Sequence, residues 1–339
     1  MKAAVLTEYK KIEVKDIPEP QIGPHEIKFR VMACGICPND YRLYTGLATW
    51  KKPPTILGHE PAGEVVGVGS KVERFKPGDM IAGDTTTRCG YCKSCLAGRE
   101  NLCTSRKNVV VGSLAQFSAA NEIWMNRFYH ASFEEAALVE PLSCVLNGIR
   151  RSGVKAGDRV AIVGAGQIGL MHLQVARMLG AKTIVIDIKN DRLSIAEKLG
   201  AEHTIDSSTS DPVVRVKELT TGGGADAVIV AIGNSRAIET GFQLVAPMGT
   251  VNLFASTNPP TNASVDPNLV HGNEVSIIGS YDKTRGDLQE ATRLIDEGRI
   301  DVRTLITNVY DLEHTADAMS AMEKGTGIKI VVRPNGVTQ

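Results

Sequence analysis

The sequence has no long apolar run and no excess of charge of either sign, and its first residues do not predict a signal peptide. No apolar run approaches the roughly 20 residues that a membrane-spanning helix needs. Lysine plus arginine and aspartate plus glutamate both total 38, so nothing favours nucleic acid or an anionic membrane as a partner. The first residues, MKAAVLTEYKKIEV, lack the apolar core of a signal peptide and predict a strand. We therefore expect a cytoplasmic protein that acts on a small molecule, with no nucleic acid and no membrane as partner.

Internal repeats and low-complexity segments are also missing, and the cysteines do not suggest a disulfide framework. The 339 residues contain 7 cysteines, and an odd number in a reducing compartment favours metal binding or catalysis instead. A chain of this length is expected to form two domains. Its hydrophobic content of 42% and charged content of 22% are those of an ordinary globular protein.

Two kinds of sequence pattern divide the chain. Up to about residue 145, short β-type runs broken by glycine and proline, such as AAVLTEY, EIKFRVMA, AGEVVGVG and DMIAGD, predict an all-β, barrel-like module. From about residue 153, strands alternate with helices, which predicts βαβ units and a doubly wound parallel sheet. The tail that begins LQEATRLIDEG predicts helix, strand, helix and strand, and could rejoin the first domain. The expected fold class is α/β.

A glycine-rich turn follows the apolar strand RVAIV and opens a helix. Gly164, Gly166 and Gly169 fit the pattern G-x-G-x-x-G, with Gln167 and Ile168 between the last two glycines. The first glycine permits a tight turn, the second lets backbone amides approach a pyrophosphate, and the third allows close packing of helix on strand. This context predicts a dinucleotide site, and the alternative is a glycine turn that binds nothing.

The next strand, TIVID, ends at Asp187, where a carboxylate would bind the two ribose hydroxyls of NAD. A site for NADP would disfavour a carboxylate at this point and prefer arginine. Lys189 and Arg192 follow closely, so some use of NADP stays open. The prediction is NAD, with NADP as the alternative and with Arg192 as a further cofactor-binding residue.

Four cysteines lie together in the segment CGYCKSCLAGRENLC. Cys89, Cys92, Cys95 and Cys103 have the spacing C-x2-C-x2-C-x7-C, which can wrap one tetrahedral ion. Zinc is the default ion, and an iron–sulfur cluster is the rival. Because four thiolates leave no open position, this site should be structural and not catalytic.

A second group of potential ligands remains among the other cysteines, Cys34, Cys37 and Cys144. The segment GHEPAGEVVGVG supplies His59 and Glu60, and EPLSC supplies Glu140. A cysteine, a histidine and a carboxylate that leave one position for water form the pattern of a catalytic zinc site.

The order of these motifs resembles the zinc-dependent medium-chain dehydrogenases/reductases, which include the alcohol dehydrogenases. The segments GICPND, GHEPAGEVVGVGSKVERFKPGD, the four-cysteine loop, EPLSC and VAIVGAGQIG carry the resemblance over essentially the whole chain. The branch most similar is that of polyol (sorbitol) and threonine dehydrogenases, because Glu140 stands where ethanol-type enzymes have a different ligand. The resemblance implies a GroES-like β-rich catalytic domain, residues 1–146 and 282–339, and a Rossmann NAD-binding domain, residues 147–281.

The resemblance also implies a role for each site residue. Cys37 matches the cysteine ligand of the catalytic zinc, and His59 and Glu60 match the GHE pair, with His59 a direct ligand. Glu140 matches a glutamate that binds zinc directly or through water, and Asp40 matches a carboxylate that orients His59. The four-cysteine loop matches the structural-zinc lobe, so two zinc ions per subunit are expected. Cys34 and Cys144 match no ligand and are expected to be packing residues.

Asn39 departs from the family pattern, which usually has serine or threonine at this position. A carboxamide can hydrogen-bond a substrate oxygen but relays protons poorly near neutral pH. Our hypothesis is that the alcohol proton leaves through zinc-bound water with Glu60 or Glu140. Asn39 would then help to bind a substrate with several hydroxyl groups, and the alternative is a weakened relay in a slow enzyme.

The function implied is that of an NAD-dependent, zinc-containing oxidoreductase. It would transfer hydride between NAD(H) and a secondary alcohol or ketone, with a polyol, sugar or hydroxy-amino acid as substrate. Two alternatives stay open: a zinc-free quinone or enoyl reductase of the same superfamily, and a non-catalytic NAD-binding sensor or structural protein. The resemblance further implies a homodimer or homotetramer.

Overall fold

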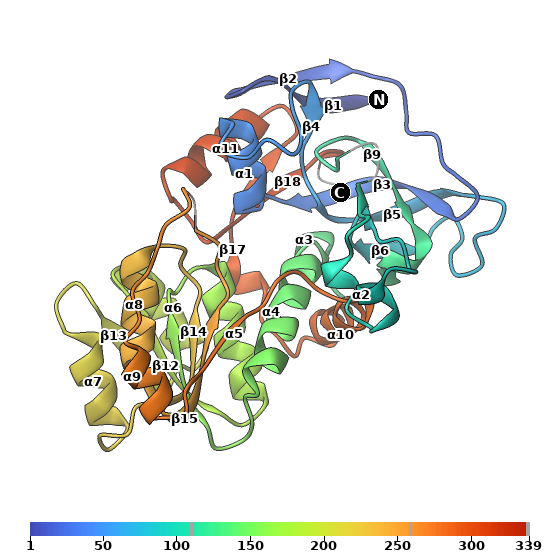
Figure 1. Cartoon of the computed structure of the whole chain (residues 1–339). Helices are drawn as coiled ribbons and strands as arrows, with labels where there is room; N and C mark the ends of the chain where they lie inside the picture. Colours follow the sequence, from blue (N-terminus) through green and yellow to red (C-terminus); the bar gives the residue numbers. More distant parts are fainter. Residues whose placement is uncertain (109–111, 258, 337–339) are drawn as a thin grey trace. The chain divides into compact units, whose positions relative to one another are not determined.

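The structure, a computed structural model, describes residues 1–108, 112–257 and 259–336 (Figure 1). The chain divides into two compact units: unit 1 comprises Met1–Ser143 and Lys283–Gln339, and unit 2 comprises Cys144–Asp282. Within the described ranges, no helix is both long enough and apolar enough to cross a membrane.

Unit 1 is built mainly from β-strands. The strands of its largest sheet are β3 (Glu26–Gly35), β5 (Glu60–Val68), β6 (Met80–Gly83), β9 (Phe117–Asn121), β10 (Met125–Arg127), β17 (Ile306–Asp311) and β18 (Lys329–Arg333). This seven-stranded sheet has the order β10-β6-β5-β3-β18-β17, and β9 also pairs with β3. A three-stranded sheet contains β1 (Lys2–Glu8), β2 (Lys11–Asp16) and β4 (Thr55–Ile56), and a two-stranded sheet contains β7 (Thr86–Thr87) and β8 (Lys107–Asn108).

The centre of the large sheet is the pair β3 and β5, which run antiparallel. In the first half of β3, Ile27, Phe29 and Val31 are fully buried at alternate positions, as expected of a strand with one face on the core. The pairing ends with Gly35 opposite Glu60, and β18 lies on the other side of β3, with Val331 opposite Gly35. The sheet therefore brings three distant segments together at one point.

Short helices flank the sheets of unit 1. They are α1 (Pro38–Thr45), α2 (Lys93–Leu96), α3 (Phe133–Ala136), α10 (Arg285–Asp296) and α11 (Thr315–Glu323), with the 3₁₀ turns η1 (Glu100–Leu102), η2 (Glu122–Trp124) and η3 (Arg303–Leu305). Helices α1 and α11 lie side by side (Figure 1). The longer helix α4 (Val139–Ser152) contains the boundary between the units.

Unit 2 contains a six-stranded parallel sheet. Its strands are β11 (Arg159–Val163), β12 (Lys182–Asp187), β13 (His203–Asp206), β14 (Ala225–Val230), β15 (Val245–Leu253) and β16 (Ser276–Gly279), in the order β13-β12-β11-β14-β15-β16. Its helices are α5 (Gln167–Met178), α6 (Asn190–Lys198), α7 (Pro212–Leu219), α8 (Ser235–Leu244) and α9 (Pro267–Gly272). Strands such as β11 and β14 are buried over nearly their whole length, which is typical of a parallel sheet covered by helices.

The glycine turn between β11 and α5 has the close packing that its sequence predicts. Gly164 has a φ of 107°, which a side chain would disfavour. A Cβ atom on Gly169 would lie 1.7 Å from the carbonyl oxygen of Gly164, so helix α5 can approach the turn only with glycine here. Both observations fit the roles that the G-x-G-x-x-G pattern predicts for these residues.

The expected fold class is confirmed: an α/β protein with a β-rich GroES-like part and a Rossmann-type parallel sheet. The four apolar runs predicted as strands near the N-terminus are found as β1, β3, β5 and β6. The tail forms the predicted succession α10, β17, α11 and β18, and its two strands pair within the sheet of unit 1.

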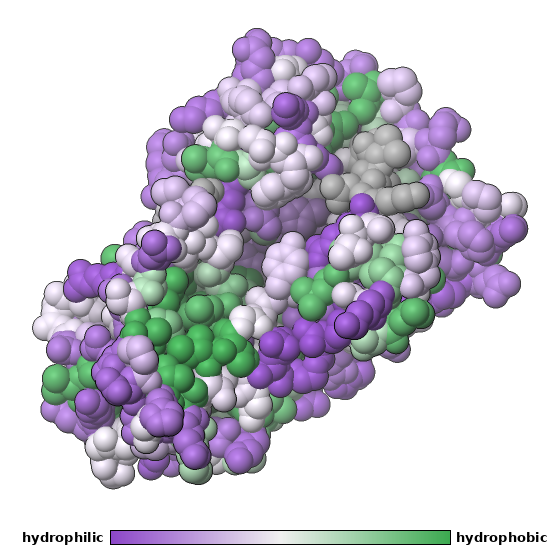
Figure 2. All heavy atoms as spheres, viewed as in Figure 1, coloured by the Kyte–Doolittle hydropathy of each residue, from purple (hydrophilic) through white to green (hydrophobic). Residues whose placement is uncertain are grey.

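Part of the surface of unit 2 is apolar. On the face shown in Figure 2, apolar side chains are concentrated over this part of the chain, whereas the rest of the face is mostly polar. The large exposed apolar side chains of unit 2 include Ile188, Val214, Met248, Val265 and Ile277. Contiguous apolar surface of this kind is often found where proteins associate.

One histidine in unit 2 is buried with only one of its ring nitrogens hydrogen-bonded in the described part of the chain. His172 of α5 is fully buried, and its Nδ1–H donates to the carbonyl of Ile168 at 2.9 Å. Its Nε2 has no hydrogen-bond partner in the described part of the chain, and the ring meets Phe254 edge-on at 4.6 Å between centroids. Burial lowers the pKa of His172 to about 4, so the native protein holds this ring neutral.

We predict that His172 makes the protein less stable in mild acid. Between about pH 6.5 and pH 4 the His172 ring binds a proton in the unfolded chain but not in the native state. The free energy of unfolding therefore falls by up to about 3 kcal/mol. The variant His172→Leu should lose this part of the pH dependence, measured by urea unfolding across that range. The exposed His271 provides a matched control, His271→Gln. An unchanged pH slope in His172→Leu would contradict the prediction.

Candidate metal and cofactor sites

The pairing of β3 with β5 brings the predicted catalytic ligands together in unit 1. Cys37 is the N-cap residue of α1, just beyond the end of β3. Glu60 is the first residue of β5, and His59 directly precedes it. Their potential ligand atoms all lie within 4.8 Å of one another. A thiol, an imidazole and a carboxylate at this spacing fit the donor set of a zinc site with one open position.

Asp40 holds the histidine of this group in place. Its carboxylate is 2% exposed and accepts the backbone N–H groups of Cys37 and Gly58, both at 3.0 Å. The His59 Nδ1 atom lies 3.3 Å from Asp40 Oδ1. Burial would raise the pKa of Asp40, but the His59 charge and the two amides outweigh burial and lower it. Asp40 thus has the partners expected of a carboxylate that orients a metal-binding histidine.

Glu60 has a buried cation as its partner. Its Oε2 atom pairs with the ammonium of Lys329, which is fully buried and also donates to the carbonyl of Ile36 at 3.1 Å. Gly35 leaves the space for this pair, because a Cβ atom there would lie 2.1 Å from Glu60 Oε2 and 2.7 Å from Lys329 Cε. The carboxylate is therefore fixed beside Cys37 and His59.

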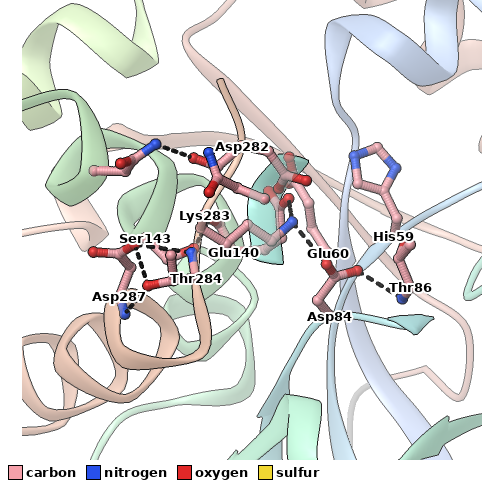
Figure 3. A network of polar contacts seen from close by, with 12 residues as sticks. His59, Glu60, Asp84, Thr86, Glu140, Ser143, Asp282, Lys283, Thr284 and Asp287 are labelled. Atoms are coloured by element: carbon pink, nitrogen blue, oxygen red, sulfur yellow. Dashed lines mark hydrogen bonds and ion pairs between the residues drawn. The ribbon is translucent and has the colours of Figure 1, made fainter. Parts of the chain in front are cut away.

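Glu140 does not join the group formed by Cys37, His59 and Glu60. It lies in the first turn of α4, is 7% exposed, and its Oε1 atom pairs with the ammonium of Lys283 (Figure 3). Burial raises the pKa of the Glu140 carboxyl, and the charge of Lys283 opposes that rise. The sequence motif that contains Glu140 gives no sign of this lysine partner.

Asn39 lies beside Cys37 in the first turn of α1 and is exposed. Its Oδ1 atom accepts a hydrogen bond from Arg42 Nη1 at 3.3 Å. Of the aromatic residues that follow, Tyr44 donates its hydroxyl to the carbonyl of Lys10 at 2.9 Å, whereas Trp50 is 60% exposed. Tyr44 thus has a structural contact of its own.

The four cysteines of the loop that contains α2 are arranged around one point. Their potential ligand atoms lie within 4.8 Å of one another, and the Sγ–Sγ distances include 3.9 Å for Cys89–Cys95, 3.5 Å for Cys92–Cys95 and 3.6 Å for Cys89–Cys103. Four sulfurs at about 2.3 Å from a tetrahedral zinc would lie about 3.8 Å apart. The observed distances fit such a site and are far too long for disulfides.

Backbone amides in this loop favour thiolates. The amide of Cys92 donates to Cys89 Sγ at 3.3 Å, and the amide of Ser105 donates to Cys103 Sγ at 3.4 Å. Amides of Cys95 and Thr104 lower the pKa of Cys92 to about 6. The chemistry of these donors fits a metal ion bound by sulfur. The two cysteines outside both groups differ in exposure: Cys34 is fully buried in the core and Cys144 is partly exposed.

The predicted cofactor residues surround the N-terminus of α5 in unit 2. Gly166 is the N-cap residue of this helix, and a Cβ atom on it would meet no atom closer than Arg192 Nη1, at 3.9 Å. Gln167 and Ile168 begin the helix, and the buried Gln167 Nε2 atom has no partner in the described residues. Open space and free donors at a helix N-terminus fit an anionic group such as a pyrophosphate.

Asp187 ends β12 next to this turn. It is 5% exposed, and its two carboxylate oxygens accept the backbone amides of Ala165 at 2.6 Å and Lys189 at 2.9 Å. These bonds fix an acidic group at the carboxyl end of the strand, where Rossmann folds bind the ribose of a dinucleotide.

Comparison with known proteins gives consistent matches. Residues 23–128 match the family profile of the alcohol dehydrogenase GroES-like domain, and residues 168–297 match that of zinc-binding dehydrogenases. The chain is 33% identical to sorbitol dehydrogenase of Bacillus subtilis (strain 168), over 99% of this chain and 98% of that protein. It is 32% identical to L-threonine 3-dehydrogenase of Bacillus licheniformis, over 94% of each chain.

Solved structures have the same fold. A dehydrogenase structure from Sinorhizobium meliloti 1021 with NADP bound is 31% identical, with a TM-score of 0.92, over 98% of this chain and 99% of that chain. The structure of 2R,3R-butanediol dehydrogenase from Bacillus subtilis is 28% identical, with a TM-score of 0.89, over 98% and 99% of the two chains.

We predict that a methyl group at position 35 disturbs the pair formed by Glu60 and Lys329. Because both partners are buried, Gly35→Ala should lower the free energy of unfolding by about 2 kcal/mol, measured by urea denaturation. Gly272 provides the control, since a Cβ atom there would meet nothing within 4 Å, and Gly272→Ala should be close to neutral. Equal stability of the two variants would refute this interpretation of Gly35.

Proposed function

The chain belongs to the zinc-binding alcohol dehydrogenase family with a GroES-like domain, and we propose that it is an NAD-dependent dehydrogenase of polyols or related secondary alcohols. It is an oxidoreductase of the type that uses zinc and a nicotinamide cofactor. The observation that carries the proposal is the convergence of Cys37, His59 and Glu60, with Asp40 bonded to the histidine. In this proposal unit 1 is the catalytic domain and unit 2 is the cofactor-binding domain.

The residues of unit 1 fit a catalytic zinc. Cys37, His59 and Glu60 would hold the ion, and Asp40 engages one nitrogen of the His59 ring, so that the other is left for the metal. When bound, zinc supplies Lewis-acid chemistry that lowers the pKa of a substrate hydroxyl, and the nicotinamide supplies the hydride acceptor. Glu60 and Glu140 remain the proposed acceptors of the alcohol proton, through water.

A second zinc is proposed for the four-cysteine loop. The Sγ–Sγ distances of 3.5 to 3.9 Å support a tetrahedral sulfur site there. Four sulfur ligands leave no position for a substrate, so this ion would stabilise the loop and take no part in the reaction.

NAD is proposed as the preferred cofactor. The buried carboxylate of Asp187 supports this preference, because it would hydrogen-bond ribose hydroxyls and repel a 2′-phosphate. Arg192 is the residue that would favour NADP, since its guanidinium lies near Gly166. Because a related structure from Sinorhizobium meliloti has NADP bound, the preference of this chain between the two cofactors has to be measured.

The proposed substrate is a polyol, a sugar or a hydroxy-amino acid. Similarity to a sorbitol dehydrogenase, to a D-arabitol-phosphate dehydrogenase of Enterococcus avium and to an L-threonine 3-dehydrogenase supports this class. Asn39 would bind a substrate hydroxyl through its amide nitrogen, since its oxygen accepts from Arg42. The exposed apolar residues of unit 2 (Figure 2) support the expected homodimer or homotetramer. The cytoplasmic location stays a prediction from the sequence.

The proposed function is tested by a screen of NAD⁺ reduction over polyols, sugars, threonine and simple secondary alcohols. We expect turnover with at least one substrate that has several hydroxyl groups, and loss of that activity when a chelator removes the metal. Activity that survives complete metal removal would favour the zinc-free reductase. A chain that binds zinc and NAD but oxidises nothing in the screen would favour the non-catalytic alternative.

We predict that Asp187 sets the choice of cofactor. Removing its charge with Asp187→Ser should lower kcat/KM for NAD⁺ about tenfold or more and narrow the gap to NADP⁺, because the ribose hydroxyls lose their acceptor. For comparison, Arg192→Gln should lower kcat/KM for NADP⁺ more than kcat/KM for NAD⁺. The prediction is wrong if the unaltered enzyme already prefers NADP⁺, or if Asp187→Ser changes neither value.

A further inference from the structure

A buried lysine lies between two carboxylates close to the catalytic ligands. Lys283 is 3% exposed, and its ammonium pairs with Glu140 and lies 2.9 Å from Asp84 Oδ2 (Figure 3). Both carboxylates are largely buried, since Asp84 is 1% and Glu140 is 7% exposed. A charge buried in this way is strongly unfavourable unless it has partners, so the three groups depend on one another.

The cluster is completed by Arg88, which balances its charge. Arg88 Nη1 donates to Asp84 Oδ2 at 2.6 Å, and its guanidinium lies 4.2 Å from the centre of the Trp124 ring. Two carboxylates and two cations thus form a neutral buried group. Although burial opposes it, the charges of Lys283 and Arg88 hold the pKa of Asp84 below its usual range, so Asp84 is an anion that anchors Lys283.

The backbone of Lys283 is fixed by the start of α10. Thr284 is the N-cap residue of this helix and forms a capping box with Asp287: the Thr284 amide and hydroxyl donate to Asp287 Oδ2 at 2.8 and 2.7 Å (Figure 3). A capping box orients the chain that enters a helix. Lys283 therefore comes from a rigid segment, and its side chain has anions on two sides.

Glu60 and Glu140 differ in their position relative to the potential metal ligands Cys37 and His59. Both pair with a buried lysine, but Glu60 belongs to the group whose ligand atoms lie within 4.8 Å of one another, together with Cys37 and His59. Glu140 pairs with Lys283 and is not a member of that group. The two glutamates thus pair with different lysines, and only Glu60 belongs to the group of potential metal ligands.

We propose that Lys283 is a positioning residue that keeps the Glu140 carboxylate off the zinc, so that the fourth coordination position stays open for the substrate oxygen. The inference rests on the proposed function, since it needs a zinc ion at Cys37, His59 and Glu60. A carboxylate near a dication is a ready ligand. The ammonium of Lys283 competes for it, and Asp84 holds that ammonium in place.

The consequence of removing Lys283 follows from the charges. With methionine at this position, Asp84 and Glu140 would both lose the Lys283 ammonium, and the group formed by Asp84, Glu140 and Arg88 would carry a net negative charge. Glu140 would then gain most by moving to the zinc as a fourth protein ligand. The open position would close, while the affinity for zinc would not fall.

The test uses protein loaded with Co²⁺ in place of zinc and imidazole as the probe of the open position. A site of four cysteines cannot add imidazole, so a change in the visible spectrum of Co²⁺ reports on the other site. We expect Lys283→Met to bind imidazole about tenfold or more weakly than the unaltered protein, with its metal content unchanged. The double variant Lys283→Met/Glu140→Gln should recover the original affinity, and the exposed Lys198→Met serves as control.

Other outcomes would overturn the inference. It is wrong if Lys283→Met binds imidazole as well as the unaltered protein does, or if the double variant does not recover. If Lys283→Met does not fold, Glu140→Gln decides: retained metal and retained imidazole binding support the inference, and loss of Co²⁺ from the Cys37 site makes Glu140 a direct ligand and refutes it. A chain that never takes up metal at Cys37, His59 and Glu60 would refute the proposed function as well, which separates the two failures.

Discussion

The antiparallel register of β3 and β5, which sets Gly35 opposite Glu60, is the constraint on which the proposed catalytic centre depends. Because side chains alternate along a strand, a shift of one residue would turn Glu60 to the other face of the sheet. The register also places Cys37, two residues beyond Gly35, beside the His59–Glu60 pair. The absence of a side chain at position 35 then leaves room for Lys329, which arrives from β18.

Three acidic residues near the predicted zinc site are each paired with a basic side chain. Asp40 pairs with His59, Glu60 with Lys329, and Glu140 with Lys283. Unpaired carboxylates at such depth would be costly, and several free carboxylates near one dication could all become ligands. The pairing therefore does two things: it allows the acidic groups to be buried, and it decides which of them stays near the metal ligands.

Features that depend on neighbours in sequence could be predicted from the sequence. The turn from Gly164 to Gly169 and the loop from Cys89 to Cys103 are local, so spacing alone indicates their geometry. The fold class followed from the change of pattern near residue 150, since strand and helix periods differ. The lysine partners could not be predicted, because Lys283 and Lys329 lie far along the chain and lysine is normally a surface residue. Only the tertiary fold brings them to Glu140 and Glu60. The contact between Arg42 and Asn39, in contrast, is local, since the two residues lie three positions apart within α1.

Anomalous diffraction at the zinc edge from crystals of the zinc-loaded protein would test the central claim most directly. We expect one zinc within the four-cysteine loop and another bound by Cys37, His59 and Glu60, with Glu140 still paired to Lys283. A catalytic zinc with a Glu140 oxygen at the ligand distance of about 2.0–2.2 Å, or no zinc at Cys37, would contradict it.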